Sequence, residues 1–189
     1  MSTGYRIREV RPTDRDPIVQ GYLALYHERE SNPTLGIVLA RTPPPVEAEN
    51  AWFDALLESV RVGRKVVRVA EVDGRAVGLC EVTQKGSETN ADEAHVGELG
   101  LLVHERHRGQ GIGEALLREV LARCAGRFEI VVLSVFGNNT PAKRLYAKVG
   151  FRSCGSLPRG IKRSGFYTDS DRMFLELVPP DAHSRAAAS

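Results

Sequence analysis

The stretch Leu99–Leu117, LGLLVHERHRGQGIGEALL, decides how the rest of the chain is interpreted. It begins with an apolar run typical of a strand, passes through a basic, glycine-rich turn, and continues with apolar residues at helical spacing. Gly109, Gly111 and Gly113 lack the Cβ atoms that would keep a ligand away from the backbone, and they permit a tight turn. The N–H groups that open the following helix have no intrahelical partner and carry partial positive charge. The stretch therefore predicts a site for a pyrophosphate.

Two other phosphate-binding loops have requirements that this stretch does not meet. A P-loop needs Lys followed by Ser or Thr after its last glycine, and Glu114-Ala115 stand there instead. A dinucleotide-binding loop follows its strand directly, with an acid at the end of the next strand. Here five residues separate Val103 from Gly109, and the next strand ends in Ser134-Val135-Phe136. A glycine-rich turn without a ligand stays open as an alternative.

Apolar periodicity predicts the elements on either side of this stretch. Phe128–Val135 is almost continuously apolar, which is typical of a central strand buried on both faces. The other expected strands are Tyr5–Val10, a hairpin over Lys65–Thr83 with its turn at Asp73-Gly74, Val96–Val103, Phe151–Ser156 and Arg172–Leu177. The first expected helix follows a turn and N-cap at Pro12-Thr13-Asp14 and runs to about Arg29. The others are Val46–Arg61, Ile112–Cys124 and Pro141–Val149. This order predicts an α/β (α+β) fold with a mixed sheet and helices on both faces.

Length and composition bound the class of protein. The 189 residues suffice for one domain, expected over residues 1–178, with a flexible tail at 179–189 and a polar surface loop at 84–93. Apolar residues make up 42% and charged residues 26%, and the net charge of +2 gives no reason to expect a nucleic acid or a membrane as partner. No signal peptide or membrane-spanning run is apparent, so we expect a cytoplasmic protein.

The glycine-rich stretch resembles the acetyl-CoA-binding motif of the GNAT superfamily of N-acetyltransferases. The signature of that motif is Arg or Gln, two residues, Gly, one residue, and Gly or Ala. Arg108, Gly111 and Gly113 fill its three places. The segment Asn138–Phe151, NNTPAKRLYAKVGF, is similar to the second motif of the family, in which an Asn leads a short helix that carries a Tyr and ends at Gly-Phe. The likeness extends over about residues 5–178.

The resemblance implies a mostly antiparallel seven-stranded sheet whose fourth and fifth strands splay apart to admit the pantetheine arm of acetyl-CoA. Backbone groups of β-strand residues Leu101 and Val103 would bind that arm as an added strand would. The residues that the resemblance places at the coenzyme are Leu101, Leu102, Val103, Arg108, Gly109, Gln110, Gly111, Ile112, Gly113, Glu114, Asn139 and Tyr146. Asn139 either touches the pantetheine or caps its helix, with Asn138 and Thr140 as alternative caps.

The resemblance also implies direct transfer of the acyl group to an amine. Tyr146 matches the usual proton donor to the departing thiolate, although its spacing also places it on the buried side of its helix. Glu98, an isolated acid within an apolar strand, is the candidate general base, where partial desolvation would raise its pKa; it could equally face solvent or bind substrate. His95 and His104 are weaker candidates for the base.

Other reactive side chains are assigned no catalytic role. His104 and His107 lack the cluster of further ligands that a metal site requires, so no metal is expected. The widely spaced Cys80, Cys124 and Cys154 are interpreted as reduced, partly buried core residues, because none has an evident His partner.

The sequence says little about the acceptor. By analogy with the family, it would lie against residues 22–46 and 157–171, and we expect a small molecule such as an amino acid, an amine or an amine-bearing antibiotic. A protein N-terminus or lysine remains an alternative acceptor. So does a domain of a different class, a sensor that binds acyl-CoA without catalysis. The family also makes a homodimer plausible.

Overall fold

The computed structural model of the protein describes residues 4–32, 35–86, 90–163 and 165–177, so the predicted tail at 179–189 lies outside the described residues. Three short 3-10 turns are η1 (Pro12–Asp14), η2 (Ala91–Glu93) and η3 (Glu105–His107). The helices are α1 (Arg15–Ser31), α2 (Val46–Arg61), α3 (Ile112–Cys124) and α4 (Thr140–Val149). The strands are β1 (Arg6–Arg8), β2 (Lys65–Val72), β3 (Arg75–Gln84), β4 (Val96–Val103), β5 (Ile130–Phe136), β6 (Arg152–Arg163) and β7 (Phe166–Glu176).

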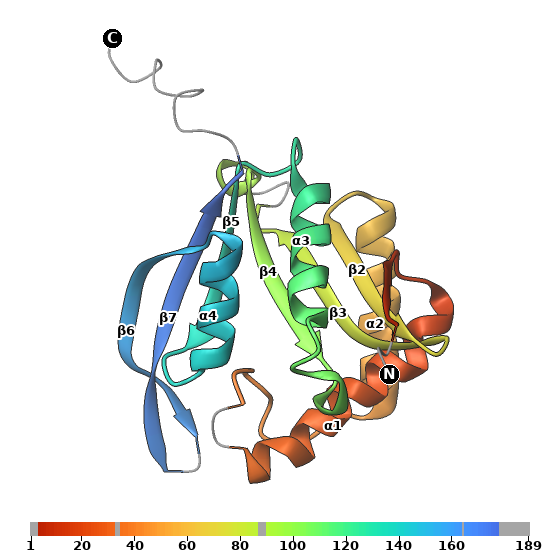
Figure 1. Ribbon diagram of the computed structural model, residues 1–189, viewed down its shortest axis with the longest axis horizontal. Coiled ribbons are helices and arrows are strands. Elements are labelled where there is room, and N and C mark those ends of the chain that lie inside the picture. Colours follow the sequence, from red (N-terminus) through yellow and green to blue (C-terminus); the bar gives the residue numbers. More distant parts are fainter. Residues whose placement is uncertain (1–3, 33–34, 87–89, 164, 178–189) are drawn as a thin grey trace.

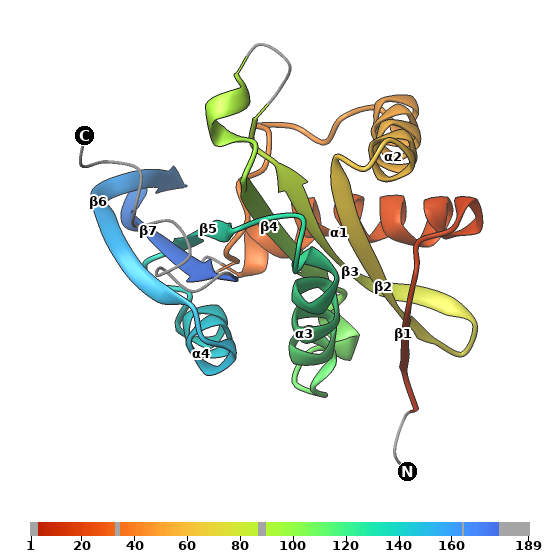
Figure 2. The same ribbon diagram turned by 90° about the horizontal axis from the view of Figure 1, so that it is seen from above.

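The strands form one seven-stranded sheet in the order β1-β2-β3-β4-β5-β7-β6. β4 and β5 are parallel, and every other neighbouring pair is antiparallel. The helices α1 and α2 cover one face of the sheet, and α3 and α4 cover the other (Figures 1 and 2). The mixed, mostly antiparallel sheet with helices on both faces is the predicted fold, which is thus confirmed.

Each face of the sheet has its own apolar core, because successive side chains of a strand point to opposite faces. On β2, Val67 and Val69 pack with Ile18 of α1 and Phe53 of α2. On the other face, the buried residues include Val66 and Ala70 of β2, Leu116, Leu117 and Val120 of α3, and Tyr146 of α4. The core of the α3/α4 face is the larger, and it holds the helix that follows the glycine turn.

A buried ion cluster holds the beginning of the chain. Asp14, 3% exposed, accepts two hydrogen bonds of 2.7 Å from the guanidinium of Arg8, which also donates to Glu71. The sequence predicted N-cap chemistry for α1 at this position. That prediction was wrong for the Asp14 side chain, because its carboxylate binds Arg8 and the Arg11 N–H rather than an amide of α1.

Two predicted features differ from the structure in the last strands. β6 and β7 reach Arg163 and Phe166, so most of the segment 157–171 is paired strand rather than loop. Cys154 lies on the exposed strand β6, whereas Cys80 and Cys124 are buried as expected. A long antiparallel hairpin of polar residues carries no apolar alternation, so its extent was not visible in the sequence.

β5 was expected to be buried on both faces, and this was wrong for one of them. Val131, Leu133 and Val135 are buried against α3 and α4, whereas Ser134 is exposed. On the same face Ile130 and Val132 are half-buried, and only Phe136 is buried. An apolar sequence predicted the strand itself but not the opening beside it.

We predict that Gly97→Ala destabilises the protein. A Cβ at Gly97 would stand 2.3 Å from Val82 Cγ1 and 3.3 Å from the ring of Phe128, both in the core. Such overpacking should lower the free energy of unfolding by about 1–3 kcal/mol, measured by urea denaturation. Gly100→Ala on the same strand is the control, since its nearest neighbour is Glu81 Cγ at 3.4 Å. Equal losses in the two variants would contradict this account.

Candidate active site

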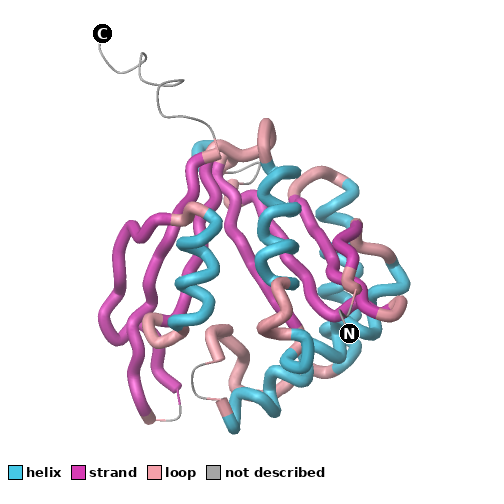
Figure 3. The backbone as a smooth tube through the Cα atoms, in the orientation of Figure 1, coloured by secondary structure: helices cyan, strands magenta, loops and turns pink. Residues whose placement is uncertain are grey.

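The candidate site lies where β4 and β5 stop pairing with each other. Within the described residues, the two strands pair only from Val96–Ile130 to Glu98–Val132. β4 continues to Val103 without a strand on that side, and the two strands separate toward their C-terminal ends (Figures 1 and 3). Backbone groups on this edge of β4 need hydrogen-bond partners, which an extended ligand can supply.

The three predicted coenzyme residues of β4 lie along this open edge. Leu101 and Val103 pack against the α3/α4 core, and their side chains reach to 3.8 Å from the position of a Cβ on Gly113. Leu102 points to the opposite face, where it is buried with Leu25 and Leu35. Their side chains are therefore engaged in packing, and their backbone is what remains for a ligand.

The glycine turn has the geometry that an anion site needs. Gly109 and Gly111 have φ angles of 73° and 83°, in the left-handed region that favours glycine. Gly111 is the N-cap of α3, and no side chain caps this helix end. The first amide groups of α3 are consequently left for a ligand. Gly113 serves packing instead, because a Cβ there would stand 3.3 Å from Leu145 Cδ2 of α4.

Three other residues of the predicted coenzyme set are partly engaged by the protein itself. Ile112 is 1% exposed, so only its backbone can meet a ligand. The Gln110 amide donates to Arg106 O at 3.1 Å. Glu114 forms ion pairs with Lys148 of α4 at 2.6 Å and with Arg118 at 3.1 Å, which lower the pKa of its carboxyl. Glu114 thus joins the two helices that flank the site.

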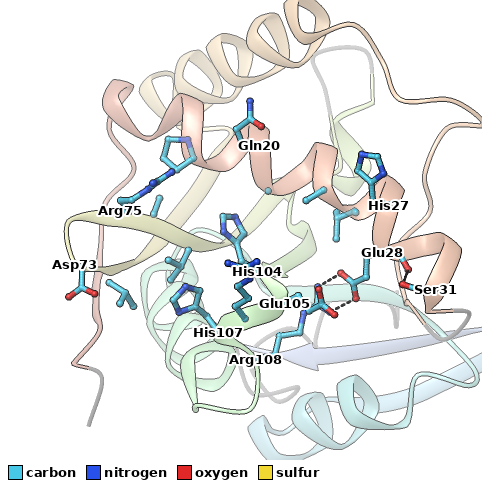
Figure 4. Close-up of a pocket in the computed structure, with 18 residues that line it drawn as sticks. Gln20, His27, Glu28, Ser31, Asp73, Arg75, His104, Glu105, His107 and Arg108 are labelled. Atoms are coloured by element: carbon cyan, nitrogen blue, oxygen red, sulfur yellow. Dashed lines mark hydrogen bonds and ion pairs between the residues drawn. The ribbon is translucent and has the colours of Figure 1, made fainter. Parts of the chain in front are cut away.

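Arg108 lies at the turn, but its guanidinium points to α1. It donates to both carboxylate oxygens of Glu28 (Figure 4). Its Nε donates to Val103 O at 2.8 Å. Glu28 is 8% exposed, and the hydrogen bonds from Arg108 lower the pKa of its carboxyl. In this conformation Arg108 fixes the shape of the turn, and the amides carry the positive potential for an anion. Sequence reasoning did not identify Glu28 as its partner.

His104 follows β4 and packs against α1. Its ring fits where α1 has Gly21, since a Cβ there would stand 2.0 Å from His104 Nε2. That nitrogen is buried and has no hydrogen-bond partner among the described residues. Burial lowers the pKa of His104, and the neighbouring charges of His107, Arg108 and Arg75 lower it further (Figure 4). His104 is therefore placed as a neutral packing residue between the turn and α1, lining a groove of about 750 Å³.

Tyr5 is a neighbour of the turn that sequence reasoning missed. Its hydroxyl lies 3.6 Å from the position of a Cβ on Gly111. Tyr5 is 36% exposed, so the hydroxyl can reach a ligand on the turn. Its position before β1 gave no motif by which it could have been found.

Tyr146 lies on the buried side of α4, as its helical spacing predicted. It is 8% exposed, and its ring packs on Phe151 with centroids 5.8 Å apart. Burial raises the pKa of its hydroxyl well above the ordinary value, and nearby Cys80 adds to the shift. The hydroxyl therefore stays protonated at neutral pH, as a hydrogen-bond or proton donor must be.

Asn139 is the N-cap of α4. Its Oδ1 accepts from the Ala142 N–H at 3.2 Å, which decides among the three capping alternatives. Its Nδ2 lies against Gly36 of the loop after α1, 2.0 Å from where a Cβ would stand. Asn139 thus connects α4 with that loop across the end of β5.

Glu98 is the last residue of β4 that pairs with β5, where its partner is Val132. Its side chain is exposed, so the partial desolvation expected from the sequence is not found. On the neighbouring strand, Glu81 lies beside Gly100 and is paired with Lys65 at 2.8 Å. Glu98 remains the carboxylate nearest the point of divergence on β4 itself.

Arg163 connects the two segments predicted to bind the acceptor, residues 22–46 and 157–171. Its guanidinium donates to Leu35 O and Ile37 O after α1 and lies 4.8 Å from the Phe136 ring centroid. Asp171, in the second of these segments, is paired with Lys143 at 2.8 Å. The structure thus brings the two segments together, and the Asp171 carboxylate is already engaged by the protein.

Among the described residues, the buried cysteines and the possible metal ligands show no arrangement that suggests a catalytic role. Burial raises the thiol pKa of Cys124 to about 12 and that of Cys80 well above its ordinary value, which makes both poor nucleophiles. In the described part of the chain, no three His, Cys, Asp or Glu side chains gather so that they could hold a metal ion. None of the described helices is both long and apolar enough to cross a bilayer.

A protein-family model described as the acetyltransferase (GNAT) family matches residues 23–151. The matched range includes the diverging strands, the glycine turn and Tyr146. The chain belongs to the GNAT family. This confirms the resemblance noted in the sequence, and the protein is accordingly a GNAT-type N-acetyltransferase.

Two relatives and one solved structure show which proteins resemble this chain. It is 32% identical over 130 residues to the L-amino acid N-acetyltransferase AaaT of Escherichia coli (strain K12), covering 67% of this chain and 75% of AaaT. It is 25% identical over 162 residues to the L-methionine sulfoximine/L-methionine sulfone acetyltransferase of Pseudomonas paraeruginosa, covering 84% and 89%. The Salmonella typhimurium protein yncA, solved with its cofactor acetyl-CoA, has a TM-score of 0.78 at 24% identity and covers 98% of both chains. This last similarity shows the GNAT fold.

The low pKa of His104 predicts a pH-dependent stability. Because the pKa of His104 in the folded protein lies below the ordinary value of 6.5, the unfolded chain protonates this side chain at a higher pH than the folded protein does. The contribution of His104 to the free energy of unfolding is therefore full above about pH 6.5, and it is lost as the pH falls through the pKa of the folded state. We expect the thermal unfolding midpoint to drop between about pH 7.5 and 5.5, and to drop less in His104→Asn.

His27→Asn is the matched control, because His27 is exposed on the same helix that His104 contacts. This variant should keep the pH dependence of the unsubstituted protein. The low pKa of Glu28 acts in the same direction, but only below about pH 4.5, outside the window. An unchanged pH dependence in His104→Asn would show that His104 is not the responsible group.

Proposed function

We propose that the protein transfers an acetyl group from acetyl-CoA to the primary amine of a small molecule, by direct attack within a ternary complex. The observation that carries this proposal is the open backbone edge of β4 beside the glycine N-cap of α3. An extended amide chain that ends in a pyrophosphate has matching features: the chain can pair with the edge, and the phosphates can accept from the amides of the turn.

The residues of the chain can be assigned to the steps of this transfer. The amine nitrogen attacks the thioester carbonyl carbon, and a backbone N–H of β4 stabilises the negative oxygen that forms. The C–S bond then breaks, and Tyr146 donates a hydrogen bond or proton to the departing sulfur. Glu98 accepts a proton from the amine, directly or through a water molecule.

The assignment of Glu98 as general base is tested by the pH–rate profile of Glu98→Gln. An unchanged profile in this variant would contradict the assignment.

For the acceptor we propose an L-amino acid or a close analogue. Both reported relatives are named for such acceptors. The side of β4 that carries Glu98 and Leu102 faces α1 and the loop after it, which leaves this side for the amine. Arg163 adds a cation with no carboxylate partner among the described residues, which suits an acceptor that bears a carboxylate.

We predict that Tyr146→Phe lowers kcat by about 100-fold or more, the usual contribution of a positioned proton donor. Because the hydroxyl acts on the leaving sulfur, KM should change little. Thiol release from acetyl-CoA is measured with L-amino acids, L-methionine sulfone, and peptides with a free N-terminus or lysine. As a control, calorimetry should show that Tyr146→Phe binds acetyl-CoA as the unsubstituted protein does.

The same assay decides between the proposal and its alternatives. Turnover of peptides in preference to free amino acids would favour a protein acceptor. Binding of acetyl-CoA without turnover of any amine would favour a sensor. Absence of acetyl-CoA binding would overturn the proposed function, and full activity of Tyr146→Phe would remove its role as donor.

A further inference from the structure

A second pocket, of about 270 Å³, lies at the opposite end of α3 from the glycine turn. It is bounded by the last turns of α2 and α3 and by the first residues of β2. β1 pairs with β2 only from Val69 to Glu71, so β1 does not cover the edge of β2 at this pocket. The lining residues are Glu9, Val10, Val60, Lys65, Val66, Val67, Arg68, Arg123 and Arg127.

Arg68 is the unusual member of this lining. Its side chain is 9% exposed, yet its one hydrogen bond to another described residue runs from Nη1 to Val67 O. Its carboxylate neighbours, Glu9 and Glu119, lie at 3.5 and 3.7 Å, outside good hydrogen-bond distance. A guanidinium whose N–H groups are mostly left unpaired by the protein is expected to meet another acceptor, from a ligand or from water. The donors of Arg68 therefore leave a place for an oxygen-bearing anion.

The charges around the pocket also favour an anion. Arg127 donates to Gly63 O and has no ion-pair partner among the described residues, and Arg123 lies 3.4 Å from Glu119. Helix C-termini attract cations, which accounts for Arg123 at the last turn of α3 and Arg127 just beyond it. That explanation does not extend to Arg68, which lies within a strand.

The carboxylate of Glu9 lies beside Arg68 but is weakly held there. Its side chain is 77% exposed, and its carboxylate meets Arg68 only at 3.5 Å. Displacing it would cost little, because a carboxylate this exposed and this far from its partner gains little from the ion pair. Its departure would leave Arg68 and Arg127 lining a pocket with room for a small anion.

We propose that this pocket is an anion-binding site for a phosphate group, held by the guanidinium groups of Arg68 and Arg127, with Glu9 in its place when the phosphate is absent. The two negative charges of a phosphate dianion balance the two positive charges of Arg68 and Arg127, and its oxygens match the planar fork of an arginine. The site is separate from the glycine turn, so it does not serve the acetyl donor.

Titration with inorganic phosphate, followed by NMR of backbone amides and arginine side chains, tests this proposal in the full chain. The signals of Arg68, Arg127 and Val67 should shift and saturate together, independently of those of residues 109–114. Arg68→Met and Arg127→Met should each weaken this binding by about tenfold or more. Glu9→Gln should strengthen it several-fold, because the competing carboxylate is removed.

Arg61→Met is the matched control, since Arg61 is an exposed arginine near the pocket that is paired with Glu58. This variant should bind phosphate like the unsubstituted protein. If Arg68→Met does not fold, Arg127→Met and Glu9→Gln decide the question. The proposal is overturned if phosphate shifts only the signals of the glycine turn, or if the Arg127, Glu9 and Arg61 variants all bind equally.

Discussion

Backbone hydrogen bonding along β4 is the constraint on which the site depends. In the described part of the chain, three residue pairs hold β4 to β5, from Val96–Ile130 to Glu98–Val132, and no strand lies beyond them on the β5 side of β4. β5 remains paired with β7 over its whole length, so the divergence does not weaken the second part of the sheet. The cost of the opening is a set of backbone groups that lack partners until an extended ligand lies beside them. Tyr146 lies on the α3/α4 side of this divergence, and in the proposed reaction the amine approaches from the other side.

The glycine turn at the end of this edge is held in place from α1. Arg108 binds Glu28 and the Val103 carbonyl, and His104 fills the space that Gly21 leaves on the helix. These contacts join the helix that borders the acceptor side to the turn that borders the donor side. A residue expected to supply charge to the phosphates thus supplies rigidity in this conformation, and the amides at the start of α3 supply the positive potential.

Much of the fold and part of the site could be predicted from the sequence, for identifiable reasons. The helices α2 and α3 begin and end as predicted, because their apolar residues recur at helical spacing, and the left-handed Asp73-Gly74 turn was evident from residue types. Local spacing also placed Tyr146 on a buried helix face. The pairing of Arg108 with Glu28, the bridge of Arg163 to the loop after α1, and the approach of Tyr5 to Gly111 could not be predicted. Each of these contacts joins residues far apart in the chain. Such contacts depend on complementary charge or shape, which produces no periodic pattern in the sequence.

Amide hydrogen exchange with and without acetyl-CoA tests the central claim most directly. If the donor lies along the open edge of β4 with its pyrophosphate at the start of α3, acetyl-CoA should slow the exchange of residues 99–103 and 109–114 by about tenfold or more, with smaller effects on β1 and β2. Protection confined to other segments, with unchanged exchange along β4 and the turn, would contradict the account.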